Sequence, residues 1–513
     1  MSIWHLLQRA TALYPDAIGV IDGDLRLRYR EVTARSAALA RFLRARGVEP
    51  GGRVSILELN SHPFLEAYFA CAGLGAILNP LNTRLSVREV VAILRDAGAA
   101  WLLANARFAP LVDEVLQALP LQVLWIGDRE PSYEDAVAAS RGRLSPAPVT
   151  DKSVAQLYYT SGTTGRPKGV MLTHGNVCTH ALAAVAELQL SDADVWGHIA
   201  PMFHLADAWA TFAVTWVGGR HVMMPSFEAE GALETIQRGR VTISNLIPTM
   251  LNLMVKHPRV GEYDLASLRT ILSGGAPIAP DVVRRVMQVF GCDYVQTYGM
   301  TETSPYLTLS ALKRELRALP AEQQLRFRAR TGRPFLGVEL RVVDEGGRLV
   351  ADDDEQVGEI QVRGPTVTPG YWNLPDATRE AFTDDGWLRT GDLAVVDAEG
   401  YVNIVDRRKD MIICGGENVY SIEVENVLYE HPAVLEAAVY GVPDEVWGER
   451  VCAAVVPREG ELLTEADLLE LCRRRLARFK VPRVVELCES LPRTGSGKIQ
   501  KGALKARHKK QEG

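Results

Sequence analysis

The strongest constraint on the fold is an alternation, along most of the chain, of helical patterns with short β-branched runs. Helical periodicity over residues 36–46 and 87–97 is interleaved with β-prone runs at 123–126 and 241–246. Because neighbouring parallel strands must be joined by long crossover segments, usually helices, this alternation predicts an α/β protein with largely parallel sheets. A chain of 513 residues is long enough for several such layers, each with its own core.

The last hundred residues follow a different pattern. After Asp406 come a helical segment at 421–431, strand-like runs at 435–442 and 451–456, a second helix at 465–479 and a strand at 484–488. Such an order is typical of a small α+β unit. We therefore predict an N-terminal domain at 1–405, with doubly wound α/β subdomains and a small barrel-like part near 330–405. A smaller, mobile α+β C-terminal domain is predicted at 406–513.

Composition excludes several classes of protein. Apolar residues make up 47% of the chain and the formal net charge is only −6, so a mainly disordered state is excluded. A slightly acidic chain has no overall attraction for phosphate backbones, and we expect no nucleic-acid partner. The most apolar window, 64–81, is interrupted by charged and turn-forming residues. We interpret it as a buried helix running into a strand, and expect no transmembrane segment.

The cysteines and the N-terminal residues indicate the cellular compartment of the protein. Seven cysteines are scattered without CxxC spacing, which indicates neither a disulfide framework nor a zinc site. Residues 1–15 lack the basic and then apolar pattern of a secretory leader. We therefore expect a reducing, cytoplasmic environment.

A strand-like run at 154–159 leads directly into the segment TSGTTGRPKG at 160–169. Three glycines, four hydroxyl side chains and a lysine in such a loop leave backbone N–H groups accessible to an anion. The segment is not a Walker A loop, because Lys168 is followed by Gly169. It predicts a phosphate site formed by Thr160, Ser161, Gly162, Thr163, Thr164, Gly165 and Lys168.

The segment YYTSGTTGRPKGVMLTH resembles the signature of the adenylate-forming superfamily, which includes acyl-CoA synthetases, luciferases and nonribosomal peptide adenylation domains. Further segments resemble the family's motifs, in the family's order: SGGAP (273–277), QTYGMTE (296–302), GYW (370–372), GWLRTGDL (386–393), DRRKDMIICGGENVYSIEVE (406–425) and PRTGSGKIQK (492–501). The resemblance covers nearly the whole chain. It implies an ATP-dependent acid–CoA ligase that forms an acyl-adenylate, transfers the acyl group to CoA, and releases pyrophosphate and AMP.

This chemistry explains which residue types are needed. A carboxylate is a poor electrophile, whereas an acyl-adenylate has a good leaving group. Bringing an anionic acid to polyanionic ATP requires positioning and charge neutralisation, with Mg²⁺ bridging phosphate oxygens. The resemblance implies that Lys498 supplies a cation beside the α-phosphate. It also implies that Glu302, with Thr160 as a second contact, binds Mg²⁺, and that Thr301 meets the α-phosphate.

Other residues are implied to bind the nucleoside. Tyr298 is expected to stack on adenine, whose other face approaches Gly274 and Gly275. Asp392 is expected to hold both ribose hydroxyls, because its two acceptor oxygens suit a vicinal diol. Arg407 matches a second ribose contact. The remaining ATP-site residues implied by the resemblance are Ala276, Gln296, Thr297 and Gly299.

Lys409 matches the family's hinge position. Rotation of the C-terminal domain about this residue would withdraw Lys498 after adenylation. The face that carries Gly415, Gly416 and Glu417 would then admit the pantetheine thiol of CoA. No carrier-protein domain follows residue 513, so free CoA is the expected acceptor.

The segment Met202-Phe203-His204-Leu205-Ala206 bears on the acid. Amino-acid-activating relatives carry an aspartate just after this phenylalanine, so His204 disfavours an α-amino acid. His204 either gates or lines the acyl site, or is an ordinary packed histidine. Trp209 and its apolar neighbours are expected either to line that site or to be core residues.

A medium- or long-chain fatty acid is the leading substrate, and a coumarate- or benzoate-type aryl acid is the alternative. A nucleotide-binding regulator without catalytic activity is the alternative of another class. The combination of Glu302, Asp392 and Lys498 argues against it. The expected partners are the small molecules carboxylic acid, ATP and CoA. The sequence leaves peripheral membrane contact and homodimer formation open.

Overall fold

The computed structural model describes residues 1–140, 142–160, 167–275, 278, 280–444, 446–493 and 499–511. The chain divides into two compact units. Unit 1 comprises Met1–Leu340 and Val362–Leu388, and unit 2 comprises Arg341–Gln361 and Arg389–Gly513. The predicted domain boundary at 405/406 separates the part of the chain that is expected to rotate between catalytic steps. It stays a prediction.

Unit 1 contains a six-stranded sheet in the order β6-β5-β3-β4-β7-β8. Its strands are β3 (Arg53–Leu57), β4 (Ile77–Pro80), β5 (Trp101–Asn105), β6 (Gln122–Ile126), β7 (Val154–Thr160) and β8 (Lys168–Thr173). All neighbouring pairs are parallel except β7 and β8. The chain passes from β3 to β4 on one side and then to β5 on the other. This sheet therefore reverses its winding between β3 and β5.

The second sheet of unit 1 has nine strands in the order β15-β14-β13-β12-β11-β9-β10-β1-β2. They are β1 (Ile18–Asp22), β2 (Leu25–Arg28), β9 (Val195–His198), β10 (Arg220–Met223), β11 (Ile243–Asn245), β12 (Thr270–Gly274), β13 (Asp293–Gly299), β14 (Tyr306–Leu309) and β15 (Arg333–Pro334). The strands from β13 to β1 run parallel. The winding reverses between β9 and β11, so the predicted doubly wound α/β architecture is confirmed.

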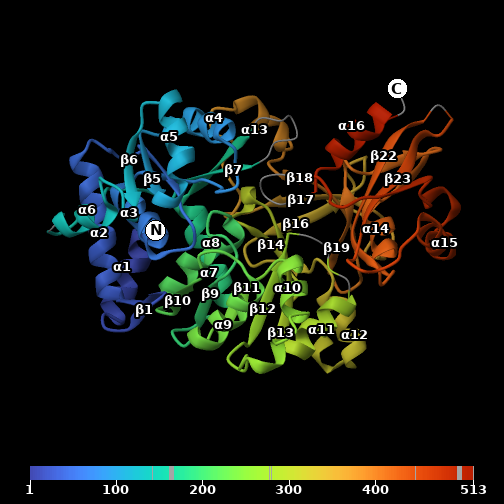
Figure 1. Cartoon of the computed structure of the whole chain (residues 1–513), viewed down its shortest axis with the longest axis horizontal. Helices are drawn as coiled ribbons and strands as arrows, with labels where there is room; N and C mark the ends of the chain where they lie inside the picture. Colours follow the sequence, from blue (N-terminus) through green and yellow to red (C-terminus); the bar gives the residue numbers. More distant parts are fainter. Residues whose placement is uncertain are drawn as a thin grey trace. The chain divides into compact units, whose positions relative to one another are not determined.

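The helices of unit 1 form layers around these sheets (Figure 1). One hydrophobic core contains side chains from both sheets together with those of α1 (Ile3–Leu13), α2 (Tyr29–Ala45), α3 (His62–Leu74), α6 (Tyr133–Ala139), α7 (His174–Glu187) and α8 (Leu205–Val217). These helices therefore lie between the sheets. The outer face of the six-stranded sheet packs on α4 (Val87–Ala97) and α5 (Ala109–Ala118). The outer face of the nine-stranded sheet packs on α9 (Ala229–Gly239), α10 (Pro248–Val255) and α11 (Pro280–Phe290).

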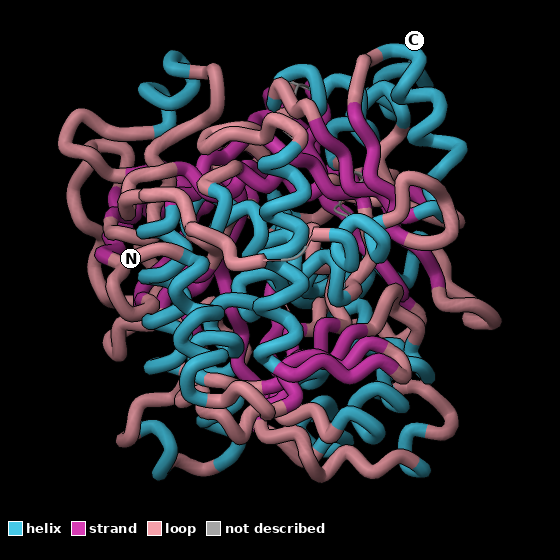
Figure 2. The backbone as a smooth tube through the Cα atoms, turned by 90° about the vertical axis from the view of Figure 1, so that its left-hand side faces the viewer, coloured by secondary structure: helices cyan, strands magenta, loops and turns pink. Residues whose placement is uncertain are grey.

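Alternation along the strands produces this layering. Ile271 and Tyr294 point to the outer core of the nine-stranded sheet, whereas the adjacent Leu272 and Val295 point to the core between the sheets. Successive side chains of a strand lie on opposite faces, so a strand buried on both faces is apolar throughout. The tube view shows the same interleaving of helices and strands (Figure 2).

The apolar window at 64–81 forms α3 followed by β4, as predicted. The helix ends at Gly75, whose φ of +73° is in the left-handed region that glycine tolerates. Glu66 is fully buried within this helix, where it accepts hydrogen bonds from Arg35 Nε at 2.6 Å and from the Tyr133 hydroxyl at 2.6 Å. These partners explain how a charged residue fits inside the window.

Unit 2 contains most of a four-stranded sheet, in the order β16-β17-β18-β19, and a second sheet of five strands. The strands are β16 (Glu339–Val343), β17 (Gly358–Arg363), β18 (Leu388–Val396), β19 (Val402–Arg407), β20 (Ile412–Cys414), β21 (Glu417–Val419), β22 (Val434–Asp444), β23 (Gly448–Pro457) and β24 (Val484–Leu487). In the five-stranded sheet, α14 (Ser421–Tyr429) and α15 (Glu465–Arg475) cover one face, and α16 (Lys501–Gln511) covers the other. The α+β character predicted for the C-terminal region is confirmed.

The remaining helices, α12 (Ala321–Arg328) and α13 (Pro375–Ala381), belong to unit 1. The helix predicted at 465–479 ends earlier, at Arg475, because Leu476 adopts an extended conformation and a short 3-10 turn follows at Arg478–Lys480. All seven cysteines are free. In the part of the chain that the structure describes, no helix is both long enough and apolar enough to cross a membrane.

Candidate active site

The carboxyl edge of the nine-stranded sheet carries several predicted site residues. The parallel neighbours β9 and β11 end at His198 and Asn245, on either side of the point where the winding reverses. Ligands of open α/β sheets bind outside the carboxyl ends of strands at such a point. The loop 199–204 leads from β9 into α8, so His204 lies near the point where the winding reverses. The Asn245 side-chain amide donates to the carbonyl of Ala206 at 3.1 Å, which ties the first turn of α8 to the end of β11.

His204 and Trp209 differ in their surroundings. His204 immediately precedes α8, is half-buried, and lies 4.6 Å from Phe203 between ring centroids. Trp209 is only 1% exposed, and its ring packs against those of Trp196 at 5.0 Å and Tyr306 at 5.2 Å. Trp209 therefore belongs to the core between the sheets, just over one helical turn beyond His204. Its contribution to an acyl site stays a prediction.

The next strand along this edge, β12, ends at Gly274. A Cβ atom on Gly274 would lie 2.4 Å from Thr297 Oγ1 and 2.6 Å from the Thr297 carbonyl oxygen, so no larger residue fits beside β13. Gly275 has a φ of +84°, and the space around its Cα is open. Both glycines are thus required by the backbone itself. The close approach of adenine to them stays a prediction.

β13 brings the QTYGMTE segment to the same edge. The side chains of Gln296 and Thr297 are buried and engaged, since Gln296 accepts from the Tyr294 hydroxyl and Thr297 donates to the Ser273 carbonyl at 3.1 Å. Tyr298 is half-buried and, by strand alternation, lies on the opposite face from Thr297. Gly299 ends the strand, packed so closely against Pro305 that a Cβ atom would meet its carbonyl oxygen.

Glu302 belongs to a short 3-10 turn, Thr301–Thr303, that follows β13 and packs against β8. Its side chain accepts a hydrogen bond from the Tyr371 hydroxyl at 2.9 Å, and its carbonyl oxygen accepts from the Thr368 N–H at 2.7 Å. Glu302 is only 7% exposed. Two segments that are 69 residues apart in sequence, QTYGMTE and GYW, therefore meet at this carboxylate.

Lys168 joins the same group of side chains. Its ammonium nitrogen lies 5.0 Å from the centroid of the Tyr371 ring, within the range of a cation–π contact. The backbones of Val170 and Tyr371 pair as an isolated antiparallel bridge, which holds GYW against β8. Burial, followed by the charge and hydrogen bond of Glu302, raises the pKa of Tyr371, so the phenol stays protonated as a donor. The structure thus brings Lys168, Tyr371 and Glu302 together.

Several predicted residues lie outside the described part of the chain: Ser161, Gly162, Thr163, Thr164, Gly165, Ala276 and Lys498. The ends of the phosphate segment are described. Thr160, at the end of β7, pairs directly with Lys168, at the start of β8. Thr160 is therefore close to Lys168, and Lys168 is linked through Tyr371 to Glu302. Thr301 is half-buried, next to Glu302.

In unit 2, Asp392 on β18 and Arg407 on β19 are directly paired across the sheet. Arg407 Nε lies 3.4 Å from Asp392 Oδ1, and the side chains are 45% and 14% exposed. Asp392 is also held from the backbone side, since its N–H donates to Thr390 Oγ1 at 3.1 Å. The two residues predicted to contact ribose are therefore neighbours, with the carboxylate oriented by the guanidinium.

Lys409 lies in an exposed turn between β19 and β20. This turn is inside unit 2 and not at its border. Gly415 and Gly416 form the next turn, with φ values of +64° and +85°. The Gly415 N–H donates to the Trp447 carbonyl at 2.7 Å, and a Cβ on Gly415 would lie 2.9 Å from the Trp447 ring. The hinge and CoA roles of these residues stay predictions.

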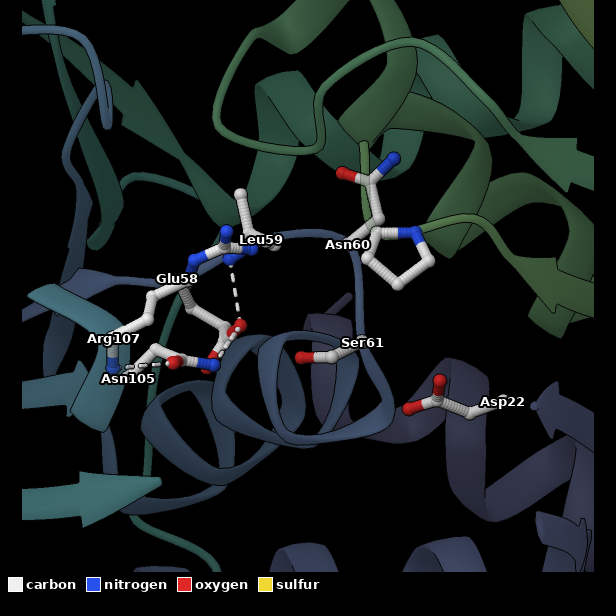
Figure 3. Close-up of a pocket in the computed structure, with 8 residues that line it drawn as sticks. Asp22, Glu58, Leu59, Asn60, Ser61, Asn105 and Arg107 are labelled. Atoms are coloured by element: carbon white, nitrogen blue, oxygen red, sulfur yellow. Dashed lines mark hydrogen bonds between the residues drawn. The ribbon is translucent and has the colours of Figure 1, made fainter. Parts of the chain in front are cut away.

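Sequence analysis missed a cavity at the carboxyl edge of the other sheet (Figure 3). It measures about 410 Å³ and lies where that sheet reverses its winding. It is lined by Asp22, Glu58, Leu59, Asn60, Ser61, Asn105, Arg107 and Pro225. Burial raises the pKa of Glu58 to about 7, although Asn105 donates to both carboxylate oxygens at 3.0 Å. No motif marked these residues, because they follow strand ends that are far apart in sequence.

The fit of the donor set to Mg²⁺ depends on the number of protein ligands. Among the described residues, no group of three or more histidine, cysteine, aspartate or glutamate side chains is arranged to hold a metal ion. Of the described carboxylates, Glu302 contacts Tyr371, whose ring packs against Lys168 at the end of the phosphate segment. Mg²⁺ is commonly held by one or two carboxylates together with substrate phosphates. The residues therefore fit an ion that arrives with ATP, and not a protein-only metal site.

The chain matches known proteins over nearly its full length. Residues 7–372 match the model of the AMP-binding enzyme family, and residues 423–498 match that of the AMP-binding enzyme C-terminal domain. A feruloyl-CoA synthase of Amycolatopsis sp is 40% identical over 500 residues, covering 97% of each chain. A long-chain-fatty-acid–CoA ligase of Thermus thermophilus is 38% identical over 524 residues, covering 99% of this chain and 96% of the relative.

A solved structure has the same fold. The anthranilate CoA ligase AuaEII in complex with anthranoyl-AMP superposes with a TM-score of 0.90 at 28% identity, covering 99% of this chain and 97% of that one. The family match spans more than half of the chain, and it agrees with the motifs that meet around Glu302. The chain therefore belongs to the AMP-binding enzymes and is an AMP-forming acid–CoA ligase that uses ATP and CoA.

Proposed function

We propose that the acid is apolar, with a medium- or long-chain fatty acid as the leading candidate. The observation that carries this proposal is the state of Asp207, the acidic residue in the first turn of α8. It is fully buried and accepts hydrogen bonds from Trp196 Nε1 at 3.1 Å and from His198 Nδ1 at 2.5 Å. A carboxylate engaged in this way does not receive a substrate ammonium group.

The rest of α8 supports an apolar substrate. Leu205, Ala208 and Phe212 are all at most 4% exposed and form part of the core between the sheets. An alkyl chain that enters beside His204 meets apolar side chains, and its burial is stabilised by about 0.8 kcal/mol for each methylene. Affinity is then expected to rise with chain length until the available space is filled. The long-chain-fatty-acid–CoA ligase from Thermus thermophilus is consistent with this assignment.

The residues around Glu302, together with Lys498, have proposed roles in adenylation. Lys168 and the phosphate segment bind the ATP phosphates, while Glu302 and Thr160 hold Mg²⁺, which neutralises phosphate charge when bound. Thr301 and Lys498 act at the α-phosphate, where Lys498 offsets the repulsion between the acid carboxylate and ATP. The same charge favours in-line attack of the carboxylate oxygen on phosphorus, with pyrophosphate as the leaving group.

The remaining roles concern the nucleoside and the second step. Tyr298 stacks on adenine, with Gly274, Gly275, Ala276, Gln296, Thr297 and Gly299 around it. Asp392 accepts hydrogen bonds from the ribose hydroxyls, and Arg407 orients it. Lys409 is the point of rotation between steps, after which the Gly415–Gly416 turn admits the CoA thiol. The thiolate sulfur then attacks the acyl carbon, and the bond to AMP breaks.

An aryl acid is the second candidate, and a specific observation favours it. The Asn245 side-chain oxygen is buried, and no donor among the described residues bonds it. Asn245 lies at the end of β11, tied to the first turn of α8 that follows His204, so a phenolic hydroxyl that reaches this buried oxygen would donate to it. The relative named feruloyl-CoA synthase, at 40% identity, is consistent with such a substrate.

The test is a substrate panel with ATP, CoA and MgCl₂, in which thioester formation is followed by AMP release. The acids are saturated fatty acids of graded length, together with benzoate, cinnamate, coumarate and ferulate. The proposal expects kcat/KM to rise with alkyl length and to exceed the values for all aryl acids. Preference for ferulate over cinnamate would instead support the hydroxyl contact at Asn245. No activity and no pyrophosphate exchange with any acid would favour a non-catalytic regulator.

A further inference from the structure

The loop 199–204, which carries His204, is held by a side chain from the other sheet of unit 1. Asn60 follows β3, and its amide nitrogen donates to the carbonyl of His198 at 2.8 Å and to that of Ala200 at 2.9 Å. The Asn60 side-chain oxygen accepts from the Met202 N–H at 2.7 Å. Asn60 is 2% exposed. Both amide hydrogens and the amide oxygen are thus used on one short stretch of backbone.

A carboxamide is the only short side chain that suits these three partners. It offers two donors and an acceptor in one plane, whereas aspartate has no donor and leucine has neither. Glutamine is longer by one methylene. The three bonds reach His198 at the end of β9, and Ala200 and Met202 in the loop beyond it. They therefore fix the path of the backbone at three alternate residues. In Figure 3 the Asn60 amide points away from Glu58 and Ser61, which line the same cavity as Asn60.

A second side chain of the same region completes the anchor. Tyr68, on α3, donates from its hydroxyl to the Met202 carbonyl at 2.9 Å and shares a 2.7 Å hydrogen bond with the Tyr158 hydroxyl. Both backbone polar groups of Met202 are therefore bound by side chains from residues 60–68. Tyr158 lies on β7, two residues before Thr160. The anchor is thus continuous with the strand that enters the phosphate segment.

The other side of His204 is fixed by the buried bonds of Asp207 with Trp196 and His198. The His204 N–H itself donates to the Pro201 carbonyl at 3.0 Å. His204 therefore sits between two anchors, of which Asn60 provides the one on the loop side. Loss of Asn60 would loosen residues 199–203, which Tyr68 would still hold at Met202, and leave the first turn of α8 attached to β9.

We propose that Asn60 is a positioning residue for acid recognition, which holds the loop 199–204 so that His204 faces the incoming acid. This inference rests on the proposed role of His204 at the acyl site. It predicts that removing the Asn60 amide weakens selection among acids, because a loosened loop no longer presents a single pocket shape. Binding of ATP is expected to be little affected, since the residues assigned to ATP come from other segments.

The experiment compares Asn60→Leu with Asn105→Leu. Asn105 is the control, because it is also an asparagine that lines the cavity, but its amide donates to Glu58 and not to the loop. Pyrophosphate exchange gives KM values for the best acid and for ATP. For Asn60→Leu we expect the acid KM to rise about tenfold or more, as the loss of three hydrogen bonds implies, with the ATP KM within about twofold of wild type. Asn105→Leu is expected to leave both KM values near wild type.

Two further variants keep the test decisive if Asn60→Leu does not fold. Tyr68→Phe removes the bonds to the Met202 carbonyl and the Tyr158 hydroxyl without changing the shape of the ring, and a smaller rise in acid KM is expected. Asn60→Asp keeps the size and the acceptor for Met202 but loses both donors, so the acid KM is expected to rise as for Leu. Discrimination between two acids of different length is measured for each variant, because a purely structural loss would not change this ratio.

The outcomes separate this inference from the proposed function. Folded Asn60 variants with unchanged acid KM and unchanged discrimination would overturn the positioning role, even with an active wild-type enzyme. An equal rise in the KM values for acid and ATP would also overturn it. A wild-type enzyme that activates only amino acids would instead refute the proposed substrate class, whatever the variants do.

Discussion

The Tyr371 hydroxyl donates to Glu302 at 2.9 Å while the face of the same ring lies 5.0 Å from the Lys168 ammonium. One aromatic residue thus contacts both the carboxylate assigned to Mg²⁺ and the cation assigned to phosphate. We therefore predict that the adenylation step depends on Tyr371.

Tyr371→Phe is expected to slow adenylation roughly tenfold, because a hydrogen bond to a charged group contributes about 1.5–3 kcal/mol. The ring remains under Lys168, so the effect isolates the bond to Glu302. Pyrophosphate exchange measured against MgCl₂ concentration should show a higher requirement for the ion. Tyr263→Phe is the control, since it removes a 3.0 Å tyrosine–glutamate bond at the surface near α9. Equal Mg²⁺ dependence in both variants would contradict the assignment of Glu302.

Lys498→Ala is expected to abolish acyl-adenylate formation while leaving thioester synthesis from supplied acyl-adenylate largely intact. The reason is that only the first step brings an anion to a polyanion. Lys505→Ala, on α16, removes another cation of the same basic C-terminal segment and is expected to leave both half-reactions unchanged. The half-reactions are measured separately, by pyrophosphate exchange and by thioester release. A folded Lys498 variant that loses both would refute this division of labour.

Glu58 is expected to make stability depend on pH. Its pKa of about 7 in the folded chain lies above the ordinary 4.5, so the folded state binds the proton more tightly. The free energy of unfolding contributed by this group therefore falls as pH rises from about 4.5 to about 7, by about 3 kcal/mol. Glu58→Gln should be more stable than wild type at pH 8 and similar at pH 4.5 in urea unfolding. Glu114→Gln, exposed on α5, should show no such pH-dependent difference.

Lys501 is expected to stabilise unit 2. It lies 2.7 Å from Glu425 and donates to Ser421 Oγ at 2.6 Å, and Ser421 Oγ in turn donates to the buried Asp406 at 2.9 Å. Lys501→Met leaves these carboxylates without a cation and should cost about 2–4 kcal/mol at neutral pH.

Hydrogen exchange of peptides covering α14 and β22 measures this loss. Burial raises the pKa of both Asp406 and Glu425, so the two acids take up protons as the solution is acidified. The difference between Lys501→Met and wild type should then shrink. Lys505→Met on the same helix is the control. Equal protection in Lys501→Met and wild type at every pH would show that the cluster is not stabilised by its charge.

Local signals in the sequence were sufficient for much of the fold. The helix predicted at 87–97 matches α4, because Ser86 and Glu89 form a capping box at its start and Gly98 ends it in the left-handed region. The run at 154–159 matches β7 for a similar reason, since its apolar β-prone residues stop at the glycine-rich segment. These features depend on residues a few positions apart, which is the range over which propensity and capping act.

The contacts that assemble the site could not be predicted in this way. Tyr371 and Glu302 are 69 residues apart, and Asn60 and Met202 are 142 apart. Neither pair shows any periodicity, because each joins loops that only the order of the strands brings together. The motifs identified Glu302 and Lys168 but gave no reason for Tyr371 to lie between them. The helix expected to reach residue 479 was also too long, since its last apolar residues pack in an extended segment and a 3-10 turn.

The place of α8 in the layers limits how the enzyme can be redesigned. The helix begins next to His204, which is proposed to meet the acid, yet nearly all of its length is core shared by two sheets. Substitutions in α8 that are meant to change the acid preference would therefore also disturb the core. A library that varies this helix would lose members through unfolding as well as through inactivity. Variation confined to the connecting segment before it offers engineers a route to altered preference with less loss of thermal tolerance.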